Sequence, residues 1–556
     1  MNNQVTGGEA VYRVLEGAGI NTVFGLLGGS MLELYDAIHG GDAIRYIGAR
    51  DERAAGHMAD AWARVTGKPG VVLGAQAGPG VVNLVTAVAE AHLAYSPLVV
   101  LAGAISRSDL GKDTFQELDQ VALFQPIAKR SILATDPGRL PDMVADAIRL
   151  AMSGRRGPVV LHVPRDLWSA EMDAPEAGPI AIARSGPPAS ADLTAIAELI
   201  GDARRPVIVA GGGLKWAGGA EALAALAEKL QIPVVASTGH ADVMRHGHPL
   251  FAGQAGPRGN AVASRLTREA DLILVIGARL AFNSTFLTHD YVSATAKIVQ
   301  IDIEGSAVGR YFPVAVGVQA DARESARAIL AACTGVDTTA WRDWLKAFEK
   351  DRAALEAERV AEATDGSVPM HPRRALAEIR AALPEDAIVT LDTGNACLQA
   401  ADRLAHYRTP GLITPLDFGL VGFGYAAALG AQAAAPDRPV ISVIGDGGFG
   451  YTMAEVTTAV RYGLPVVAVV LDNGAWGAEK AYQQSFFGGR LLGAEIDTPP
   501  LDRFAELCGA AGYAVSEPDA LCPALTDAVA AKAPAVIHVK IDPKALSPLR
   551  KDLFKR

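Results

Sequence analysis

Short, continuous apolar runs that end in Gly or Asp recur along the chain, and they restrict its fold more than any other feature. Helical periodicity fills the stretches between them, for example residues 8–18, 221–230 and 374–383. Runs that are apolar at every position suit parallel strands buried on both faces. The alternation of such strands with helices predicts an α/β protein with doubly wound parallel sheets. The expected strands are residues 71–75, 98–104, 159–163, 207–211, 272–277, 298–302, 387–392, 440–445, 466–472 and 535–541.

Two segments look like linkers between domains. Residues 173–190 (DAPEAGPIAIARSGPPAS) are rich in Pro, Ala and Gly and lack periodicity. Residues 334–372 hold a charged helix, expected over 341–363, and then the turn-like TDGSVPMHP. Cutting there leaves three blocks of ordinary domain size. We therefore expect three doubly wound parallel-sheet domains, at residues 1–173, 190–335 and 370–545.

Composition narrows the class of protein. The chain has 556 residues, of which 50% are hydrophobic and 20% charged, so it is not a disordered chain. A net charge of −10 argues against a nucleic-acid partner. No apolar stretch approaches the roughly 20 residues that a membrane span needs. The segment MNNQVTGGEAVYRVLEGAG lacks a basic region followed by an apolar core, so we expect a cytoplasmic protein without a secretory signal.

Residues 440–477 (VISVIGDGGFGYTMAEVTTAVRYGLPVVAVVLDNGAWG) carry the most chemical information. One interpretation is a dinucleotide fold, because Gly445, Gly447 and Gly450 match G-x-G-x-x-G between a strand and a helix. Asp472 then stands near the place of a ribose-binding acid, and the chain would be an NAD-binding oxidoreductase. Asp446 opposes this interpretation, because a carboxylate inside the phosphate turn repels a pyrophosphate unless a cation lies between them.

The second interpretation supplies that cation. Asp446 and Asn473 end neighbouring strands and can both offer oxygens to one Mg²⁺, which prefers few protein ligands plus phosphate oxygens. Gly447 and Gly448 let the backbone close on a diphosphate at the N-terminus of a helix. The segment resembles the signature of thiamin diphosphate (ThDP) enzymes, a G-D-G followed after one βα unit by Asn. The resemblance implies Asp446, Asn473 and the Ala475 carbonyl as the Mg²⁺ ligands, with Asp-Asn here in place of the common Asn-Asn.

A second, distant segment agrees with this resemblance. ThDP enzymes use a Glu from the N-terminal domain to stabilise the imino tautomer of the cofactor's aminopyrimidine. Residues 50–64 (RDERAAGHMADAWAR) resemble the segment that carries this Glu, with Glu52 in the catalytic place. Asp51 stands where the family commonly has His, and Gly56 replaces the second Ala of a pair.

Further motifs in both end blocks resemble cofactor loops of the same family. They imply a glycine turn beside the thiazolium, a loop under the pyrimidine, a second diphosphate turn and an apolar wedge under the cofactor. Trp476 and Gly477 follow the metal ligands, and Gln116 and Ser30 are the substrate-side candidates. The implied cofactor residues are Gly29, Glu52, Asn83, Gly394, Asn395, Gly419, Val421, Asp446, Gly447, Gly448, Asn473, Trp476 and Gly477.

The whole pattern resembles the acetolactate synthase group, including its benzaldehyde lyase and sulfoacetaldehyde acetyltransferase relatives. It implies an enzyme that decarboxylates a 2-oxo acid and transfers the acyl anion equivalent to an acceptor. Alternatives that stay open are a lyase of 2-hydroxyketones or 2-hydroxyacyl-CoA, and the formation of acetyl phosphate. Lys480 either meets an anionic substrate group or is a solvated helix lysine.

The resemblance also implies partners. In the family, the Glu and the Mg²⁺ ligands of one site come from different subunits. We therefore expect a homodimer at minimum and a homotetramer as the commoner assembly, with a small-molecule substrate and neither nucleic acid nor membrane. Residues 211–213 (GGG) resemble the nucleotide turn of the middle domain, which leaves bound FAD or ADP as a further option.

Overall fold

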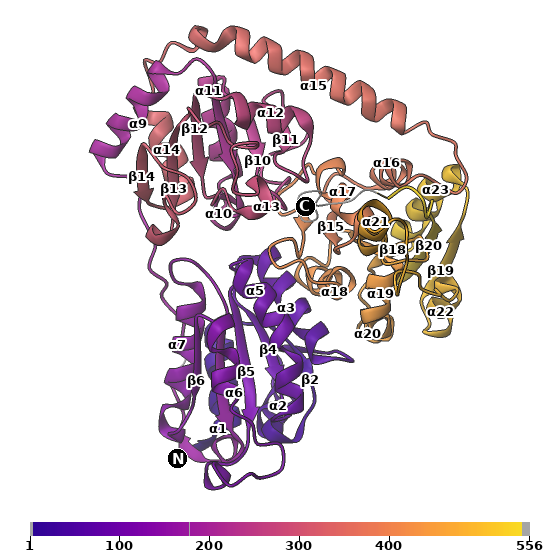
Figure 1. Cartoon of the computed structure of the whole chain (residues 1–556). Helices are drawn as coiled ribbons and strands as arrows, with labels where there is room; N and C mark the ends of the chain where they lie inside the picture. Colours follow the sequence, from indigo (N-terminus) through magenta and orange to yellow (C-terminus); the bar gives the residue numbers. More distant parts are fainter. Residues whose placement is uncertain (1–3, 177, 547–556) are drawn as a thin grey trace. The chain divides into compact units, whose positions relative to one another are not determined.

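The computed structural model describes residues 4–176 and 178–546, and their contacts form two units. The first unit holds the described residues up to Ala183 together with Tyr425–Asp437 and Thr452–Leu464. The second unit holds the remaining described residues. Three six-stranded sheets make up the architecture, and all their strands pair in parallel (Figure 1). The α/β fold with three doubly wound sheets is thus confirmed.

The first sheet lies in the first unit. Its strands in spatial order are β3 (Arg45–Gly48), β2 (Thr22–Leu26), β4 (Gly70–Gly74), β5 (Leu98–Ala104), β7 (Val159–Pro164) and β6 (Arg130–Leu133). A two-stranded antiparallel pair, β1 (Gln4–Thr6) with β8 (Glu171–Asp173), stands apart from it. The helices of this unit are α1 (Gly7–Gly17), α2 (Leu32–Gly40), α3 (Glu52–Thr66), α4 (Pro79–Asn83), α5 (Val85–Leu93), α6 (Gln120–Phe124), α7 (Leu140–Met152), α8 (Arg165–Trp168) and α20 (Val456–Tyr462).

Helices cover this sheet on both faces. The helices α1, α2 and α7 pack together over alternate strand residues such as Val71 and Leu101, which form one apolar cluster. The helix α3 packs on β2, β4 and α5. A buried ion network fixes α3 to α5: Arg64 Nη2 lies 2.6 Å from Asp60 Oδ2 and 3.0 Å from Glu90 Oε1. The orientation of α3 matters because its first residue is Glu52.

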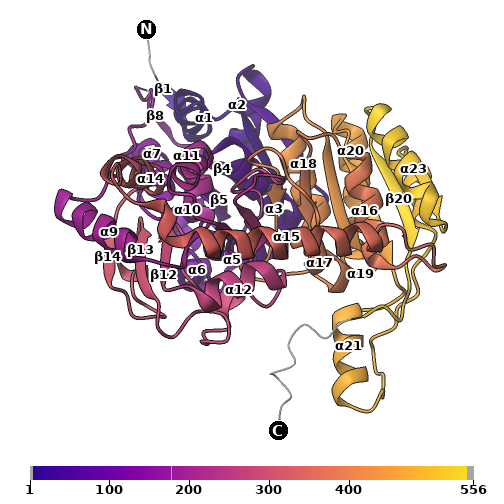
Figure 2. The same cartoon turned by 90° about the horizontal axis from the view of Figure 1, so that it is seen from above.

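The middle sheet lies in the second unit. Its strands in spatial order are β11 (Phe251–Gln254), β10 (Val234–Ala236), β9 (Pro206–Ala210), β12 (Leu272–Ile276), β13 (Lys297–Asp302) and β14 (Val316–Gln319). The long helix α15 (Arg342–Glu362) contacts both α12 (Ala261–Glu269) and α16 (Pro372–Ala382), as Figure 2 shows from above, and it matches the charged helix expected from the sequence. The other helices of this part are α9 (Ser190–Asp202), α10 (Gly212–Trp216), α11 (Ala220–Leu230), α12 (Ala261–Glu269), α13 (Phe282–Thr285) and α14 (Ala322–Ala332).

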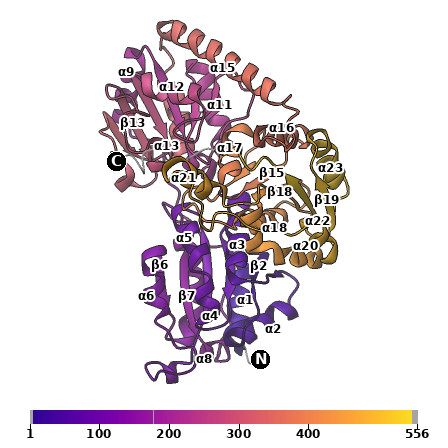
Figure 3. The same ribbon diagram turned by 45° about the vertical axis from the view of Figure 1, so that its right-hand side comes forward.

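The third sheet also lies in the second unit. Its strands in spatial order are β16 (Leu412–Ile413), β15 (Ile388–Leu391), β17 (Val440–Gly445), β18 (Val467–Asp472), β20 (Ala535–Lys540) and β19 (Ala511–Val515). The helices α16 and α23 pack together beside it (Figure 3). The helices that follow α15 in this part are α16 (Pro372–Ala382), α17 (Asn395–Arg403), α19 (Asp446–Thr452), α21 (Gly477–Phe486), α22 (Leu501–Leu507) and α23 (Pro518–Ala530), whereas all of α18 (Gly424–Ala434) except Gly424 belongs to the first unit.

The first and third sheets share one strand order. Numbered within its own domain, each sheet runs 2-1-3-4-6-5, whereas the middle sheet runs 3-2-1-4-5-6. In open parallel sheets, ligands bind beyond the carboxyl ends of the strands where this order reverses. That point lies between β2 and β4 in the first sheet and between β15 and β17 in the third. Among the described helices, none is long and apolar enough to cross a membrane.

Candidate functional site

Glu52 lies beyond the end of β3, as the first residue of α3. The helix begins there because an Asp51 carboxylate oxygen accepts a hydrogen bond from Arg53 N at 2.8 Å and caps the first turn. The Glu52 side chain is buried, and its Oε2 accepts a hydrogen bond from Asn83 Nδ2 at 3.0 Å. A Cβ at Gly80 would lie 2.9 Å from Glu52 Oε1, so glycine leaves the room that this carboxylate needs. The structure thus brings together Glu52 and Asn83, two residues that the resemblance assigns to the cofactor.

Side-chain amides connect the loops around Glu52. Gln76 follows β4; its Oε1 accepts a hydrogen bond from Gly29 N at 2.9 Å, and its Nε2 donates to Gln116 Oε1 at 2.5 Å. Gln120 Oε1 accepts from Gly78 N at 2.7 Å. Gln76 therefore joins two predicted site residues, although sequence reasoning missed it. The one signal in the sequence is its place directly before the A-G-P-G motif.

Two substrate-side candidates are held tightly in these loops. Gln116 has a left-handed backbone with φ +68°, which is uncommon outside glycine and concentrates at functional sites. Its carbonyl oxygen packs so closely on Gly78 that a Cβ there would lie 2.7 Å away. Ser30 is buried, and its Oγ accepts a hydrogen bond from Ala77 N at 3.1 Å. Its hydroxyl thus helps to fix the loop, and a substrate-side role for it stays a prediction.

Sequence reasoning also missed the carboxyl group of Glu455. This residue belongs to the first unit, through the segment Thr452–Leu464. Glu455 is buried, its Oε1 accepts from Arg50 N at 2.9 Å, and its Oε2 accepts from Thr458 Oγ1 at 2.6 Å. Burial raises the pKa of Glu455. The Glu455 carboxylate fixes the loop that leads into Glu52. Its partner Arg50 lies 405 positions earlier in the chain, so no local sequence pattern predicts this contact.

Asp446 and Asn473 follow the neighbouring strands β17 and β18 at the carboxyl edge of the third sheet. Asp446 is 5% exposed, and its Oδ2 accepts a hydrogen bond from Thr498 Oγ1 at 2.8 Å. Burial, followed by the neighbouring Asp472 carboxylate, raises the pKa of Asp446 to about 6. A cation at this carboxylate would oppose both effects.

Asp472 differs from Asp446 because the side chains of His538 and Lys540 hold it. Its Oδ2 lies 2.6 Å from His538 Nε2 and also pairs with Lys540. Burial acts to raise the pKa of Asp472, but the hydrogen bonds from His538 and Lys540 outweigh burial and hold that pKa below its usual value. Asp472 is therefore bound to its own strand neighbours, which leaves Asn473 as the residue of this pair for a metal.

The turn after Asn473 gathers further predicted residues. Asn473 Oδ1 accepts a hydrogen bond from Ala475 N at 3.1 Å, which closes an Asx turn. The Trp476 ring packs on Gly447, where a Cβ would lie 2.6 Å from the ring atom Cζ3. A Cβ at Gly477 would lie 2.7 Å from Asn473 Nδ2. Small residues are thus required around this amide and this ring.

Asp392 organises the rest of this edge of the sheet. It directly follows β15, is fully buried, and accepts hydrogen bonds from Gly422 N at 3.0 Å and from Gly424 N at 2.9 Å. Burial raises the pKa of Asp392 to about 6, although these backbone hydrogen bonds act against the rise. The loop and turn beside this carboxyl hold four predicted residues, namely Gly394, Asn395, Gly419 and Val421.

The donor set would fit a magnesium ion. In the part of the chain that the structure describes, no group of three or more His, Cys, Asp or Glu side chains could hold a metal. A metal here therefore needs amide and main-chain oxygens, which Asn473 and Ala475 offer beside the Asp446 carboxylate. Mg²⁺ binds through few protein oxygens and keeps positions for phosphate.

These residues form two half-sites, one in each unit. The Glu52 half-site comprises Glu52, Gly29, Ser30, Asn83 and Gln116. The Asp446 half-site comprises Asp446, Gly447, Gly448, Asn473, Ala475, Trp476, Gly477, Gly394, Asn395, Gly419 and Val421. Both lie at the carboxyl edge of a sheet, beside the reversal of strand order.

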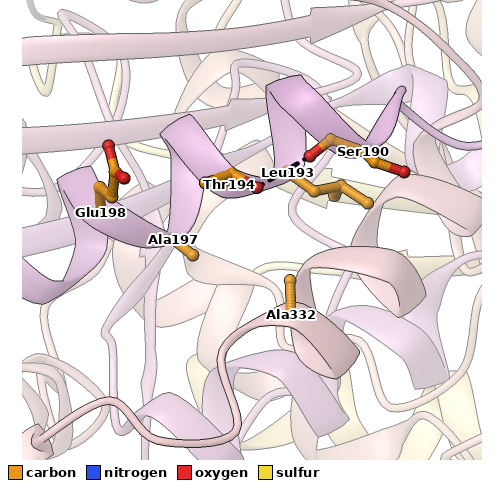
Figure 4. Close-up of a pocket in the computed structure, with 6 residues that line it drawn as sticks. All are labelled: Ser190, Leu193, Thr194, Ala197, Glu198 and Ala332. Atoms are coloured by element: carbon orange, nitrogen blue, oxygen red, sulfur yellow. Dashed lines mark hydrogen bonds between the residues drawn. The ribbon is translucent and has the colours of Figure 1, made fainter.

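The middle sheet holds none of the predicted catalytic or metal residues. Its glycine turn packs on a second turn, with Gly213 N donating to Gly277 O at 2.9 Å. A cavity of about 530 Å³ lies between α9 and α14 (Figure 4), where Thr194 Oγ1 donates to Ser190 O at 3.1 Å. FAD or ADP in this domain stays a prediction.

Three family models match the chain. They describe the N-terminal TPP binding domain, the central domain and the C-terminal TPP binding domain of thiamine pyrophosphate enzymes, at residues 5–123, 193–329 and 392–539. The sulfoacetaldehyde acetyltransferase of Castellaniella defragrans is 32% identical, over 100% of this chain and 96% of its own. That of Rhodobacter capsulatus is 34% identical, over 100% and 97%. A probable acetolactate synthase large subunit of Methanocaldococcus jannaschii is 32% identical, over 98% and 93%.

Proposed function

The chain belongs to the thiamine pyrophosphate enzyme family, in the acetolactate synthase-like group, and from this premise we propose that it is a Mg²⁺-dependent carboligase. In the proposed reaction, the enzyme decarboxylates a 2-oxo acid and joins the remaining acyl group to an acceptor. When bound, ThDP supplies the electron sink that such C–C cleavage needs. The family assignment replaces the dinucleotide interpretation of Gly445–Gly450.

The observation that carries the proposal is the buried Glu52 carboxyl group, held by Asn83 at the start of α3. In this position Glu52 holds a proton at the pyrimidine ring nitrogen. Gln76 and Gln120 fix the loops on either side, so the carboxyl group keeps one orientation. No step needs Glu52 to leave its place.

The second half of the proposal concerns the diphosphate. Asp446, Asn473 and the Ala475 carbonyl hold Mg²⁺, which neutralises diphosphate charge. Thr498 orients the Asp446 carboxylate through its hydroxyl. Val421 and Trp476 provide apolar contacts for the cofactor rings.

A homodimer at minimum, and a homotetramer beyond it, completes the proposed enzyme. Each Glu52 half-site would then meet the Asp446 half-site of a partner protomer. Exposed apolar side chains near the Glu52 half-site support this assembly: Leu27, Phe115 and Leu118 are 61%, 86% and 51% exposed. The cytoplasmic location also stays a prediction.

One observation bears on the alternative reactions. Lys480 is 9% exposed, and its Nζ lies 2.9 Å from Glu495 Oε1. The expectation of a solvated lysine is therefore wrong, and the ion pair opposes its use as a free anion binder. The formation of acetyl phosphate remains the second candidate, because relatives of similar length and 32–34% identity are named sulfoacetaldehyde acetyltransferases.

Calorimetric titration of the apo protein with ThDP, with and without Mg²⁺, tests the proposal. We expect ThDP binding that requires Mg²⁺ and that EDTA abolishes. CO₂ release from pyruvate and longer 2-oxo acids, followed by product analysis with aldehydes or inorganic phosphate as co-substrates, then separates the carboligase from the acetyl phosphate former. Metal-independent binding, or none, contradicts the proposal.

A further inference from the structure

A partly open cavity of about 230 Å³ lies beside the Glu52 half-site, within the first unit. An engineered apolar cavity of about 150 Å³ already holds benzene, so this one accommodates a molecule of several heavy atoms. It lies below the roughly 300 Å³ at which pockets for larger ligands begin, so a nucleotide or a CoA thioester does not fit. Its walls are Ala104, Ile105, Leu110, Gln116, Glu117, Leu118, Asp119, Gln120, Val121, Leu133 and His162.

Hydrogen bonds connect the cavity to the loops of the half-site. Gln116 and Gln120 line it, and they accept from Gln76 Nε2 at 2.5 Å and from Gly78 N at 2.7 Å. With its Oε1 bound to Gln76, the Gln116 amide presents its NH₂ group as the donor. A ligand in the cavity therefore lies next to the loop that carries Asn83, the partner of Glu52.

The charge of the walls selects against anions. Glu117 accepts backbone hydrogen bonds from Gly111 and Thr114, and these bonds lower the pKa of Glu117. The Asp119 carboxylate caps α6 by accepting from Ala122 N at 3.0 Å. Of the described residues that line the cavity, none is Lys or Arg.

The remaining polar wall group is a neutral imidazole. His162 is fully buried, with Nδ1 3.3 Å from Gln120 Nε2 and Nε2 3.0 Å from Ser131 Oγ. Burial lowers the pKa of His162 to about 4. Leucine, isoleucine and valine side chains cover most of the other wall positions.

We propose that this cavity binds an uncharged carbonyl compound with a hydrocarbon group, such as an aliphatic or aromatic aldehyde, as the acceptor of the reaction. The hydrocarbon group lies against Ile105, Val121 and Leu133, and the carbonyl oxygen accepts from the Gln116 amide. The two carboxylates exclude acceptors that carry a carboxylate, sulfonate or phosphate. The acceptor role rests on the proposed function.

Paired probes of equal shape test the inference without turnover. Butanamide and butanoate differ in charge, and each is titrated by ligand-observed NMR into the protein loaded with ThDP and Mg²⁺. We expect butanamide to bind about tenfold more tightly than butanoate, a difference of about 1.4 kcal/mol. Asn, like Asp, can cap a helix, so Asp119→Asn keeps the cap while it removes one negative charge from the cavity wall. The affinity of butanamide relative to butanoate should therefore fall.

The second part of the experiment fills the cavity with a larger side chain. Val121→Trp should weaken butanamide binding at least about tenfold, because the propyl group loses its apolar contact. Leu133→Trp repeats the test from β6, in case the first variant folds poorly. Leu123→Trp is the matched control, since Leu123 lies on the same helix, is 36% exposed and does not line the cavity.

The outcomes separate the two proposals. Equal or tighter binding of butanoate, or butanamide binding that neither tryptophan variant changes, overturns the inference even when ThDP binds with Mg²⁺. In that case the proposed function stands. Absence of ThDP binding overturns the acceptor role together with the proposed function, whichever probe binds.

Discussion

Glu52 and Asp446 are both buried carboxyl groups at the carboxyl edge of a parallel sheet, but their neighbours differ. Around Glu52 the hydrogen-bonding partners are neutral amides, from Asn83 directly and from Gln76 and Gln116 in the adjoining loops. Around Asp446 a second carboxylate, Asp472, lies close by and is itself bound to His538 and Lys540. A neutral surrounding suits a group that exchanges a proton, and a carboxylate surrounding suits a group that binds a cation. In the proposed function, this difference divides proton transfer, at Glu52, from charge neutralisation, at Asp446.

The largest expected effect separates proton transfer from binding. Glu52→Gln should slow exchange of the ThDP C2 proton, followed by NMR in D₂O, by about 10²–10⁴-fold, because general acid–base groups contribute on that scale. Calorimetric binding of ThDP should change little. Asp51→Asn is the control, since Asn also caps a helix. If exchange of the C2 proton is unchanged in Glu52→Gln, or is lost together with ThDP binding, the proposed division between the two half-sites is wrong.

The matching change in the other half-site should affect binding instead. Asp446→Asn removes the charge that we propose holds Mg²⁺, and the dissociation constant of Mg²⁺–ThDP should rise by more than about 100-fold, beyond the range for groups that only support a metal ligand. Thr498→Val, which removes the hydroxyl on Asp446, should raise it about tenfold. Calorimetry measures both variants. Native-like Mg²⁺ dependence in Asp446→Asn would remove Asp446 from the ligand set.

A smaller effect is expected on stability. Asp392→Asn can place an NH₂ group against the N–H groups of Gly422 and Gly424, and this should lower the free energy of unfolding by about 1–3 kcal/mol. Urea unfolding of the ThDP-free protein measures it. Thr393→Ala, which removes a hydrogen bond to the Leu420 carbonyl, is the comparison variant and should lower it by about 1 kcal/mol. If Asp392→Asn lowers the free energy of unfolding by no more than Thr393→Ala does, the Asp392 carboxyl group does not organise this loop.

The smallest expected effect is the pH dependence of the free energy of unfolding, to which a buried histidine in each unit contributes. Burial lowers the pKa of His57 in the first unit and of His406 in the second to about 3, from an ordinary 6.5. Unfolding below pH 6.5 therefore takes up a proton at each site, so the free energy of unfolding falls as the pH drops from 6.5 towards 3. The slope is at most about 1.4 kcal/mol per pH unit for each histidine. His57→Gln should flatten the slope in urea titrations at pH 5 and 7, and an unchanged slope would contradict a buried neutral His57.

Local patterns predicted ten strands in the interior of the three sheets, but not shorter strands such as β3, β11 and β16, which lie at sheet edges. The strand β17 and its G-D-G turn follow from one apolar run that ends in glycine and aspartate, and the structure places Asp446 and Asn473 at neighbouring strand ends. Glu52 followed from a resemblance over residues 50–64, and the structure shows it buried beside Asn83. Their catalytic and metal roles remain predictions.

Contacts between distant residues could not be predicted in the same way. Gln76 and Gln116 meet across 40 positions, Asp472 and His538 across 66, and Arg50 and Glu455 across 405. Such pairs depend on strand order and on the loops that follow each strand. Lys480 shows the same limit, because its partner Glu495 lies beyond its own helix and no helical spacing announces it.

The shared 2-1-3-4-6-5 strand order has a consequence for how this protein can change over evolutionary time. Both half-sites lie at the carboxyl edge of sheets with the same topology, so in the proposed function the demanding chemistry belongs to a few turns at and beside the strand-order reversal of two sheets. The turns at the amino ends of those strands carry none of it. Insertions, deletions and substitutions at the amino ends can therefore accumulate without changing either half-site. Substitutions in the wall of the cavity beside the Glu52 half-site can change the acceptor alone.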